Sequence, residues 1–174
     1  RLLPQTLYYF WGYSRIVEKK GEKVIFSVPS GNFGNLMGGL IAYNMGLPVK
    51  RFIAAVNEND EFPKFLTTGT YEKVEPSKNC ISNAMNVGHP SNLARLIDLY
   101  GGQIDETGTI HKKPNMEQMR KKIVSYSISD DETKETIKNF YNEYQGILEP
   151  HGAVGWRALQ YYRKEHPDET EFKS

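Results

Sequence analysis

The stretch of this sequence best suited to chemistry is a short polar loop at residues 29–35, which reads PSGNFGN. Gly31 and Gly34 allow the backbone to turn sharply and let a ligand approach without a Cβ in the way. The two asparagines can donate side-chain hydrogen bonds, and Ser30 or Asn35 can cap a following helix. We therefore predict a small-anion site whose binding residues are Ser30, Gly31, Asn32, Phe33, Gly34 and Asn35.

The anion that such a loop favours is a single phosphate monoester. Backbone N–H groups at a helix start have no partner within the helix, and the helix dipole is positive there. A Walker A loop needs Gly-Lys-Ser or Gly-Lys-Thr, and this loop has no lysine. A dinucleotide site needs G-x-G-x-x-G and an acidic residue at the end of the next strand, and both are absent. The alternative is a tight strand-to-helix turn that binds nothing.

The elements around this loop form a βαβ unit. Residues 24–28 are a short, β-branched apolar run typical of a buried strand, 36–45 predict a helix, and 49–56 predict the next strand. The glycine pair at 38–39 lowers helix propensity, so we expect another element to pack closely there. A βαβ unit implies parallel strands covered by helices, and we predict an α/β fold of three layers with a mostly parallel sheet.

Further elements follow along a chain that we expect to form one domain over residues 1–174. Residues 58–79 predict a connection that contains one helical turn, and 123–129 alternate as a strand does. Asp130 and Asp131 are expected to cap a helix that ends at Gly146, and Ser91 or Asn92 to cap another. The helices are predicted at 5–20, 91–102, 114–122, 130–146 and 149–167.

Composition excludes several classes of protein. The 174 residues are 39% hydrophobic and 25% charged, with a net charge of +1, so no strong field favours nucleic acid or an anionic membrane. No apolar run is long enough to span a bilayer. The single cysteine, Cys80, cannot form an internal disulfide, and we expect a cytoplasmic location. No metal is predicted, because the histidines lack metal-ligand spacing: His89, His111, His151 and His166.

Longer strings in the sequence resemble the threonine synthase family, pyridoxal-phosphate (PLP) enzymes of the tryptophan-synthase-β-like, type II fold. The main string begins SVPSGNFGNLMGGLIAYNMGLPVKRFIAAV at residue 27. Three further segments match in order, at the chain start, at 82–96 (SNAMNVGHPSNLARL) and at 130–159, which includes EPHGAV. The resemblance covers nearly the whole chain and implies that the predicted anion is the phosphate of PLP.

The resemblance also implies an activity. Threonine synthases convert O-phospho-L-homoserine and water to L-threonine and phosphate by elimination of phosphate followed by addition of water. It suggests that Asn83, Glu149 and His151 line the active site. The family more often has aspartate where this chain has Asn86, so a charged role is not expected there.

The departures from the family pattern are large. The resemblance places the lysine that forms the Schiff base with PLP in an N-terminal lobe that this chain does not contain, and the extreme C-terminal segment of the family is absent too. We therefore expect the cofactor-phosphate portion of a longer enzyme, inactive alone and prone to self-association through exposed apolar side chains. The alternatives are another type II PLP phospho-lyase or dehydratase, and a non-catalytic ligand-binding relative.

Overall fold

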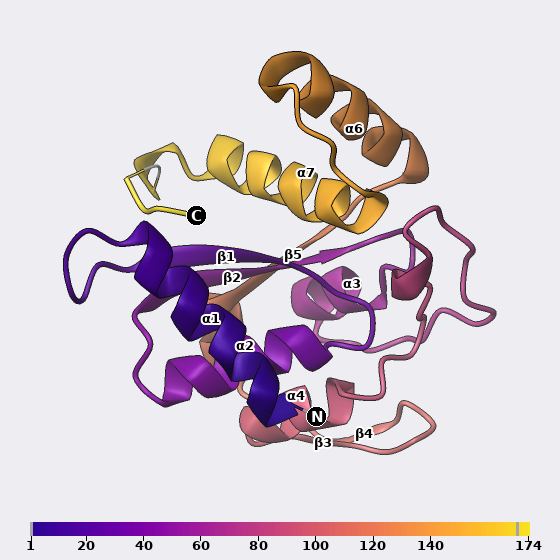
Figure 1. Cartoon of the computed structure of the whole chain (residues 1–174). Coiled ribbons are helices and arrows are strands. Elements are labelled where there is room, and N and C mark those ends of the chain that lie inside the picture. The colour runs from indigo at the N-terminus through magenta and orange to yellow at the C-terminus, as the bar shows by residue number, and fades with distance from the viewer. Residues whose placement is uncertain (1, 170) are drawn as a thin grey trace.

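A three-stranded parallel sheet lies at the centre of this computed structural model, which describes residues 2–169 and 171–174 (Figure 1). The strands are β1 (Val24–Pro29), β2 (Val49–Val56) and β5 (Ile123–Ser127), in the order β1-β2-β5. Phe26 pairs with Phe52 across β1 and β2, and Ala54 pairs with Ser125 across β2 and β5. The predicted βαβ unit is therefore confirmed, and strand 49–56 has the predicted bounds.

Helices α1 (Leu2–Ile16) and α2 (Gly34–Asn44) cover one face of the sheet. Phe52 is fully buried in this layer, where the Tyr9 ring meets the Phe26 ring edge-on at 4.9 Å. The predicted close packing at the glycine pair is confirmed, because a Cβ at Gly39 would lie 2.7 Å from the rings of Tyr9 and Phe52. The glycines of α2 thus let α1 and the sheet approach its backbone.

Helix α7 (Pro150–Glu165) covers the opposite face, and α6 (Asp130–Tyr144) packs on the outside of α7 (Figure 1). Ile53 and Ala55 alternate with the residues of the first layer and pack against Val154 and Ala158 of α7. Sheet residues that alternate between two buried faces are typical of a strand covered on both sides. The predicted three-layer α/β fold is confirmed.

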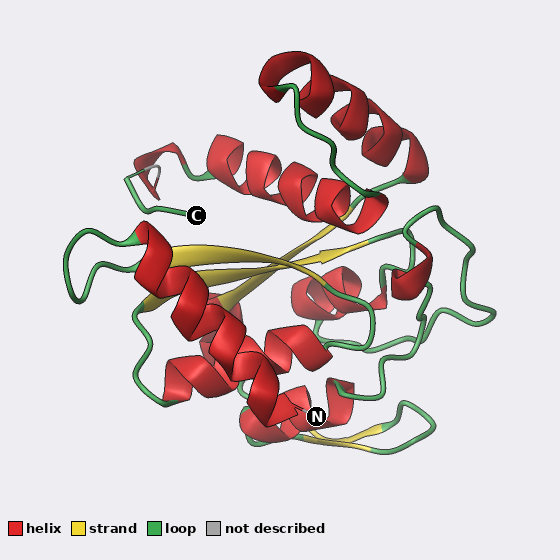
Figure 2. Ribbon diagram, viewed as in Figure 1, coloured by secondary structure: helices red, strands yellow, loops and turns green. Residues whose placement is uncertain are grey.

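The remaining elements include the helices and hairpin beside the first layer and two short 3-10 turns, the second of which follows α7 (Figure 2). They are α3 (Glu61–Thr68), a 3-10 turn (Asn83–Met85), α4 (Leu93–Leu99), the hairpin β3 (Gln103–Ile104) and β4 (Ile110–Lys112), α5 (Met116–Lys122) and a second 3-10 turn (Pro167–Glu169). The antiparallel hairpin was not predicted, because its strands have two and three residues and no clear alternation.

The predicted cap of α6 is wrong, and the predicted cap of α4 is confirmed in position only. Ser129, and not Asp130 or Asp131, caps α6, and it forms a capping box with Glu132. The serine has the extended backbone that a cap requires, whereas both aspartates already lie in the first helical turn. Asn92 occupies the cap position of α4 but makes no capping hydrogen bond.

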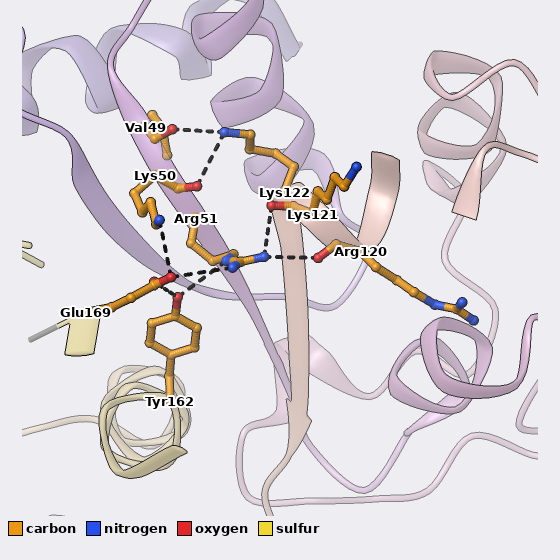
Figure 3. Close-up of polar contacts among 8 residues, drawn as sticks. All are labelled: Val49, Lys50, Arg51, Arg120, Lys121, Lys122, Tyr162 and Glu169. Atoms are coloured by element: carbon orange, nitrogen blue, oxygen red, sulfur yellow. Dashed lines mark hydrogen bonds and ion pairs between the residues drawn. The ribbon is translucent and has the colours of Figure 1, made fainter. Parts of the chain in front are cut away.

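A cluster of polar contacts joins α5 and α7 to the amino end of β2 (Figure 3). The Arg51 guanidinium donates to the last carbonyls of α5, at 3.0 Å from Arg120 O and 2.8 Å from Lys121 O, and its Nε donates to the Tyr162 hydroxyl of α7 at 3.3 Å. Glu169 pairs with Arg51 at 3.6 Å. This end of the sheet is therefore closed by protein, and the predicted loop lies at the other end.

Candidate functional site

The predicted loop leaves the carboxyl end of β1 and is tied first to the sheet. The Ser30 backbone N–H donates to Ala55 O at 2.8 Å, and the Ser30 hydroxyl donates to Val28 O at 2.8 Å. Ser30 is 3% exposed. The hydroxyl proton therefore holds the turn together, and the Ser30 oxygen does not accept from the start of α2 as a cap would.

Phe33 anchors the loop in the core and directs the chain into α2. Its side chain is 2% exposed and its ring lies 4.7 Å from that of Phe62. Its backbone has the left-handed conformation, with φ of 56°, which is uncommon for a residue with a Cβ. Phe33 is the residue before α2, and no side chain caps the helix there. The first N–H groups of α2, from Gly34 onward, are thus not used by a side-chain cap.

Asn35 was also predicted as a possible cap, and the structure gives it another partner. The Tyr9 hydroxyl donates to Asn35 Oδ1 and lies 2.9 Å from it and from the Asn35 carbonyl oxygen. Burial raises the pKa of Tyr9, so the hydroxyl keeps the proton that it donates. Tyr9 occupies the side-chain oxygen, and the amide NH₂ of exposed Asn35 makes no hydrogen bond in the described part of the chain.

Asn32 joins the loop to the start of α4. Its Oδ1 accepts from the Ser91 backbone N–H at 3.0 Å, and its carbonyl accepts from Asn92 Nδ2 at 2.8 Å. Asn92 Oδ1 in turn accepts from Arg95 at 2.9 Å. A cavity of about 570 Å³ opens beside this contact, and its lining is Leu2, Gln5, Asn32, Gly34, Ser91, Asn92 and Arg95.

Gly31 brings a second segment to the loop. A Cβ on Gly31 would lie 2.8 Å from Ala84 O and 3.0 Å from Met85 Cα, so only glycine permits this approach. Both neighbours belong to the 3-10 turn that begins at predicted site residue Asn83, whose side chain is exposed. The structure therefore brings the 82–86 segment against the loop of residues 30–35.

The start of α7 reaches the same turn through His151. Its Nε2 accepts from the Ala84 N–H at 3.1 Å, and its Nδ1 lies 2.5 Å from Glu149 Oε2. Since a backbone N–H can only donate, Nε2 is unprotonated and the Nδ1 proton points to the carboxylate. Glu149 also accepts from the N–H groups of His151 and Gly152 and so caps α7, and these hydrogen bonds lower its pKa against the raising effect of burial, which is the largest single influence. All predicted site residues thus lie near one end of the sheet.

A buried amide network supports the 82–86 segment from below. Asn57 Nδ2 donates to Asn86 Oδ1 at 2.9 Å and to Ser82 Oγ at 3.1 Å. Asn86 Nδ2 donates to Cys80 O at 3.2 Å. Asn86 therefore uses both the oxygen and the NH₂ group of its amide. This agrees with the expectation of no charged role for Asn86.

One carboxyl group in this region is buried without a complete set of partners. Glu61, at the start of α3, is 1% exposed, and its Oε2 makes no hydrogen bond within the described residues. Burial raises its pKa to about 7. Glu61 is followed by Phe62, which packs on Phe33 of the loop.

Sequence reasoning missed the residues that complete the loop from a distance. Ser91, Asn92 and Arg95 lie about 60 positions after the loop, and the asparagines of the buried network lie in two other segments. The only local signal was the polar pair at 91–92, which the sequence analysis assigned to a helix cap.

Comparison with known proteins gives one family by sequence. No family model matches the chain. It is 37% identical to the threonine synthase of Buchnera aphidicola over 166 residues, which are 95% of this chain and 35% of that protein. It is 38% identical to the threonine synthase of Escherichia coli over 160 residues, or 92% of this chain and 34% of that protein. The chain thus spans about a third of the length of the curated relatives it matches.

Solved structures agree with this result. The structure described as PLP-bound threonine synthase from Brucella melitensis matches 92% of this chain and 37% of its own, with a TM-score of 0.84 and 27% identity. Yeast threonine synthase matches 97% of this chain and 38% of its own, with a TM-score of 0.80 and 30% identity. Maize serine racemase, at 17% identity and a TM-score of 0.60, shows the fold alone. By sequence and by fold, this chain is a homologue of about one third of threonine synthase, with the type II fold of PLP enzymes.

Proposed function

We propose that this chain is the cofactor-phosphate portion of an enzyme that converts O-phospho-L-homoserine and water to L-threonine and phosphate. The observation that carries the proposal is the uncapped start of α2 at the loop of residues 30–35, in a chain homologous to threonine synthases. The substrate, the cytoplasmic location and the lobe with the Schiff-base lysine are parts of the same proposal. Among the described residues, every helix is too short or too polar to be a membrane span.

The described residues fit the phosphate group of PLP. The first N–H groups of α2 and the free amide NH₂ groups of Asn32 and Asn35 are donors without a side-chain acceptor in the described part of the chain. A dianionic phosphate is stabilised by such donors at the positive end of a helix dipole. When bound, PLP would supply an electron sink for the carbanions of the reaction.

The other residues would shape the site. Gly31 and the 3-10 turn at Asn83 form one wall of the proposed site, and His151 holds this wall through the Ala84 N–H. Glu149 fixes the imidazole tautomer that accepts this bond. His151 and Glu149 are therefore proposed to orient the site, since both are already bonded to protein.

The experiment that tests this function uses the full-length protein. It is incubated with PLP and O-phospho-L-homoserine, and phosphate and threonine are measured together. Equal amounts of both products are expected. Phosphate without threonine would instead assign another type II phospho-lyase, and a bound cofactor with neither product would assign a different substrate or a non-catalytic relative.

A second measurement tests the loop assignment on the 174-residue chain. Titration with PLP is expected to shift the backbone amide NMR signals of residues 31–35 first, because their N–H groups would receive the phosphate. Inorganic phosphate serves as the control for the anion without the aldehyde. Shifts scattered over surface lysines would contradict the assignment, since they report nonspecific aldehyde chemistry.

A further inference from the structure

Arg95 lies at the wall of the cavity that opens onto the phosphate loop. The cavity, about 570 Å³ in volume, is shared by Asn32 and Gly34 of the loop, Gln5 of α1, and Arg95 of α4. A Cβ built on Gly34 would lie 3.7 Å from both the Gln5 Nε2 and the Asn92 Nδ2 atoms. The first residue of α2 thus faces this cavity.

The position of the guanidinium is set by the loop itself. Arg95 donates to Asn92 Oδ1 at 2.9 Å, and the amide group of the same Asn92 donates to Asn32 O at 2.8 Å. One asparagine therefore connects the arginine to the main chain of the loop. This link holds the arginine close to the loop. The other polar contacts of the loop are between uncharged groups.

The charge of Arg95 is not neutralised by a partner. No carboxylate in the described part of the chain forms an ion pair with it, whereas Lys64, Lys121 and Lys173 each have one. A guanidinium remains charged at physiological pH and matches the geometry of phosphate oxygens. A helix start supplies only about half a unit of positive charge, which does not balance the negative charge of a phosphate dianion.

We infer that Arg95 is an anion-binding residue whose guanidinium donates to a phosphate monoester in this cavity. The inference rests on the proposed function, since the two phosphate monoesters of that reaction are the cofactor and the substrate. The chemistry is the same for both, and the experiment distinguishes them. Asn92 is a positioning residue, because it acts through Arg95 and the loop.

The test compares Arg95→Gln, Arg95→Lys and Asn92→Ala in the full-length protein, with Arg15→Gln as the matched control. Arg15 is an exposed arginine in the last turn of α1, at the end of the helix opposite Leu2 and Gln5. Thermal unfolding first verifies that each variant is folded. Three quantities are then measured: the Kd for PLP, the Kd for pyridoxal, which lacks the phosphate, and the KM for O-phospho-L-homoserine.

If Arg95 binds the cofactor phosphate, Arg95→Gln raises the Kd for PLP by about tenfold or more and leaves the Kd for pyridoxal unchanged. If it binds the substrate phosphate, the KM rises by a similar factor and both Kd values stay constant. In either case Arg95→Lys retains part of the affinity, Asn92→Ala shows a smaller effect in the same direction, and Arg15→Gln shows none.

Unchanged Kd and KM values in Arg95→Gln would overturn the inference, as would equal losses for PLP and pyridoxal. Failure of the proposed function is seen separately in the wild-type protein. A wild-type protein that binds PLP but forms no threonine would contradict the proposed reaction. The Kd values for PLP and pyridoxal would then still test whether Arg95 binds the phosphate.

Discussion

Gly31 and Gly34 are three residues apart in the same loop but have different surroundings. A Cβ on Gly31 would meet backbone atoms of Ala84 and Met85, which cannot move without the 3-10 turn. A Cβ on Gly34 would meet only side-chain atoms at 3.7 Å, and all three of these residues line the cavity. The two glycines therefore serve packing and ligand access, respectively.

Alanine substitutions are expected to separate these roles. Gly31→Ala should lower the free energy of unfolding by about 1–3 kcal/mol, the usual cost of overpacking. Gly34→Ala should unfold like the wild type but bind PLP more weakly, since its methyl group points into the cavity. Urea denaturation and PLP titration of both variants test this, and a Gly31→Ala protein of wild-type stability would contradict it.

Glu61 gives a pH-dependent prediction at the same scale. Its folded-state pKa of about 7 exceeds the ordinary value of 4.5, so the folded state binds the proton more tightly than the unfolded state. The stabilisation is complete below pH 4.5 and is lost as the pH rises to about 7. Its size is on the order of 3 kcal/mol, because the folded-state pKa of about 7 lies well above 4.5 and each pKa unit corresponds to about 1.4 kcal/mol.

Glu61→Gln should therefore stabilise the protein relative to wild type at pH 8 by more than at pH 4.5. Urea denaturation at both pH values measures the difference. Glu72→Gln, at an exposed loop position, is the matched control. An equal effect of Glu61→Gln at both pH values would show that Glu61 ionises as an ordinary carboxyl group.

The chemistry of the loop could be predicted from the sequence, but the hydrogen-bond partners of its residues could not. The freedom of glycine and the hydrogen-bonding groups of asparagine are local properties, so PSGNFGN was enough to predict an anion site. The contacts of Asn32 with Ser91 and Asn92 join positions 59 and 60 residues apart. Such pairs follow from how the helices pack, and neither residue type fixes them.

At the scale of elements, two helix starts meet at the site and are arranged in opposite ways. α2 begins at Gly34 without a side-chain cap, whereas α7 begins with Glu149, whose carboxylate accepts from two of its N–H groups. One helix start is therefore available to an anion and the other is already neutralised. The strand–loop–helix order was predictable from apolar patterning, while the short hairpin β3–β4 lacked a pattern long enough to detect.

The link between α7 and the 3-10 turn is tested at His151. His151→Ala removes the acceptor of the Ala84 N–H, which should speed hydrogen exchange at Ala84 and destabilise the protein by about 1 kcal/mol. His111→Ala is the control, since His111 pairs with Asp105 on the distant hairpin. Unchanged exchange at Ala84 in His151→Ala would contradict the role of His151 in holding this wall.

At the scale of the whole molecule, one helix face remains apolar and exposed. The three-layer arrangement buries Tyr9 of α1 but leaves large apolar side chains of the same helix 65–72% exposed: Leu3, Leu7, Tyr8 and Trp11. Spacings of four residues place Leu3, Leu7 and Trp11 along one side of the helix. Exposed apolar patches of this kind mark interaction surfaces.

The 174-residue chain is expected to self-associate through this face. Sedimentation velocity should show concentration-dependent association, which the double substitution Leu7→Lys and Trp11→Glu should reduce. Lys134→Glu, on the exposed surface of α6, is the charge-changing control and should leave association unchanged. A wild-type chain that sediments as a monomer at all accessible concentrations would rule this out.

The left-handed backbone of Phe33 is held by a ring buried against Phe62, and this contact also sets where the following amides point. Core packing and ligand recognition therefore cannot be varied independently at this place. In a saturation mutagenesis screen scored by growth at limiting cofactor, substitutions at Phe62, which never faces the ligand, should cluster with those at Asn32 and Gly34. Supplementation with excess cofactor should rescue the milder of them.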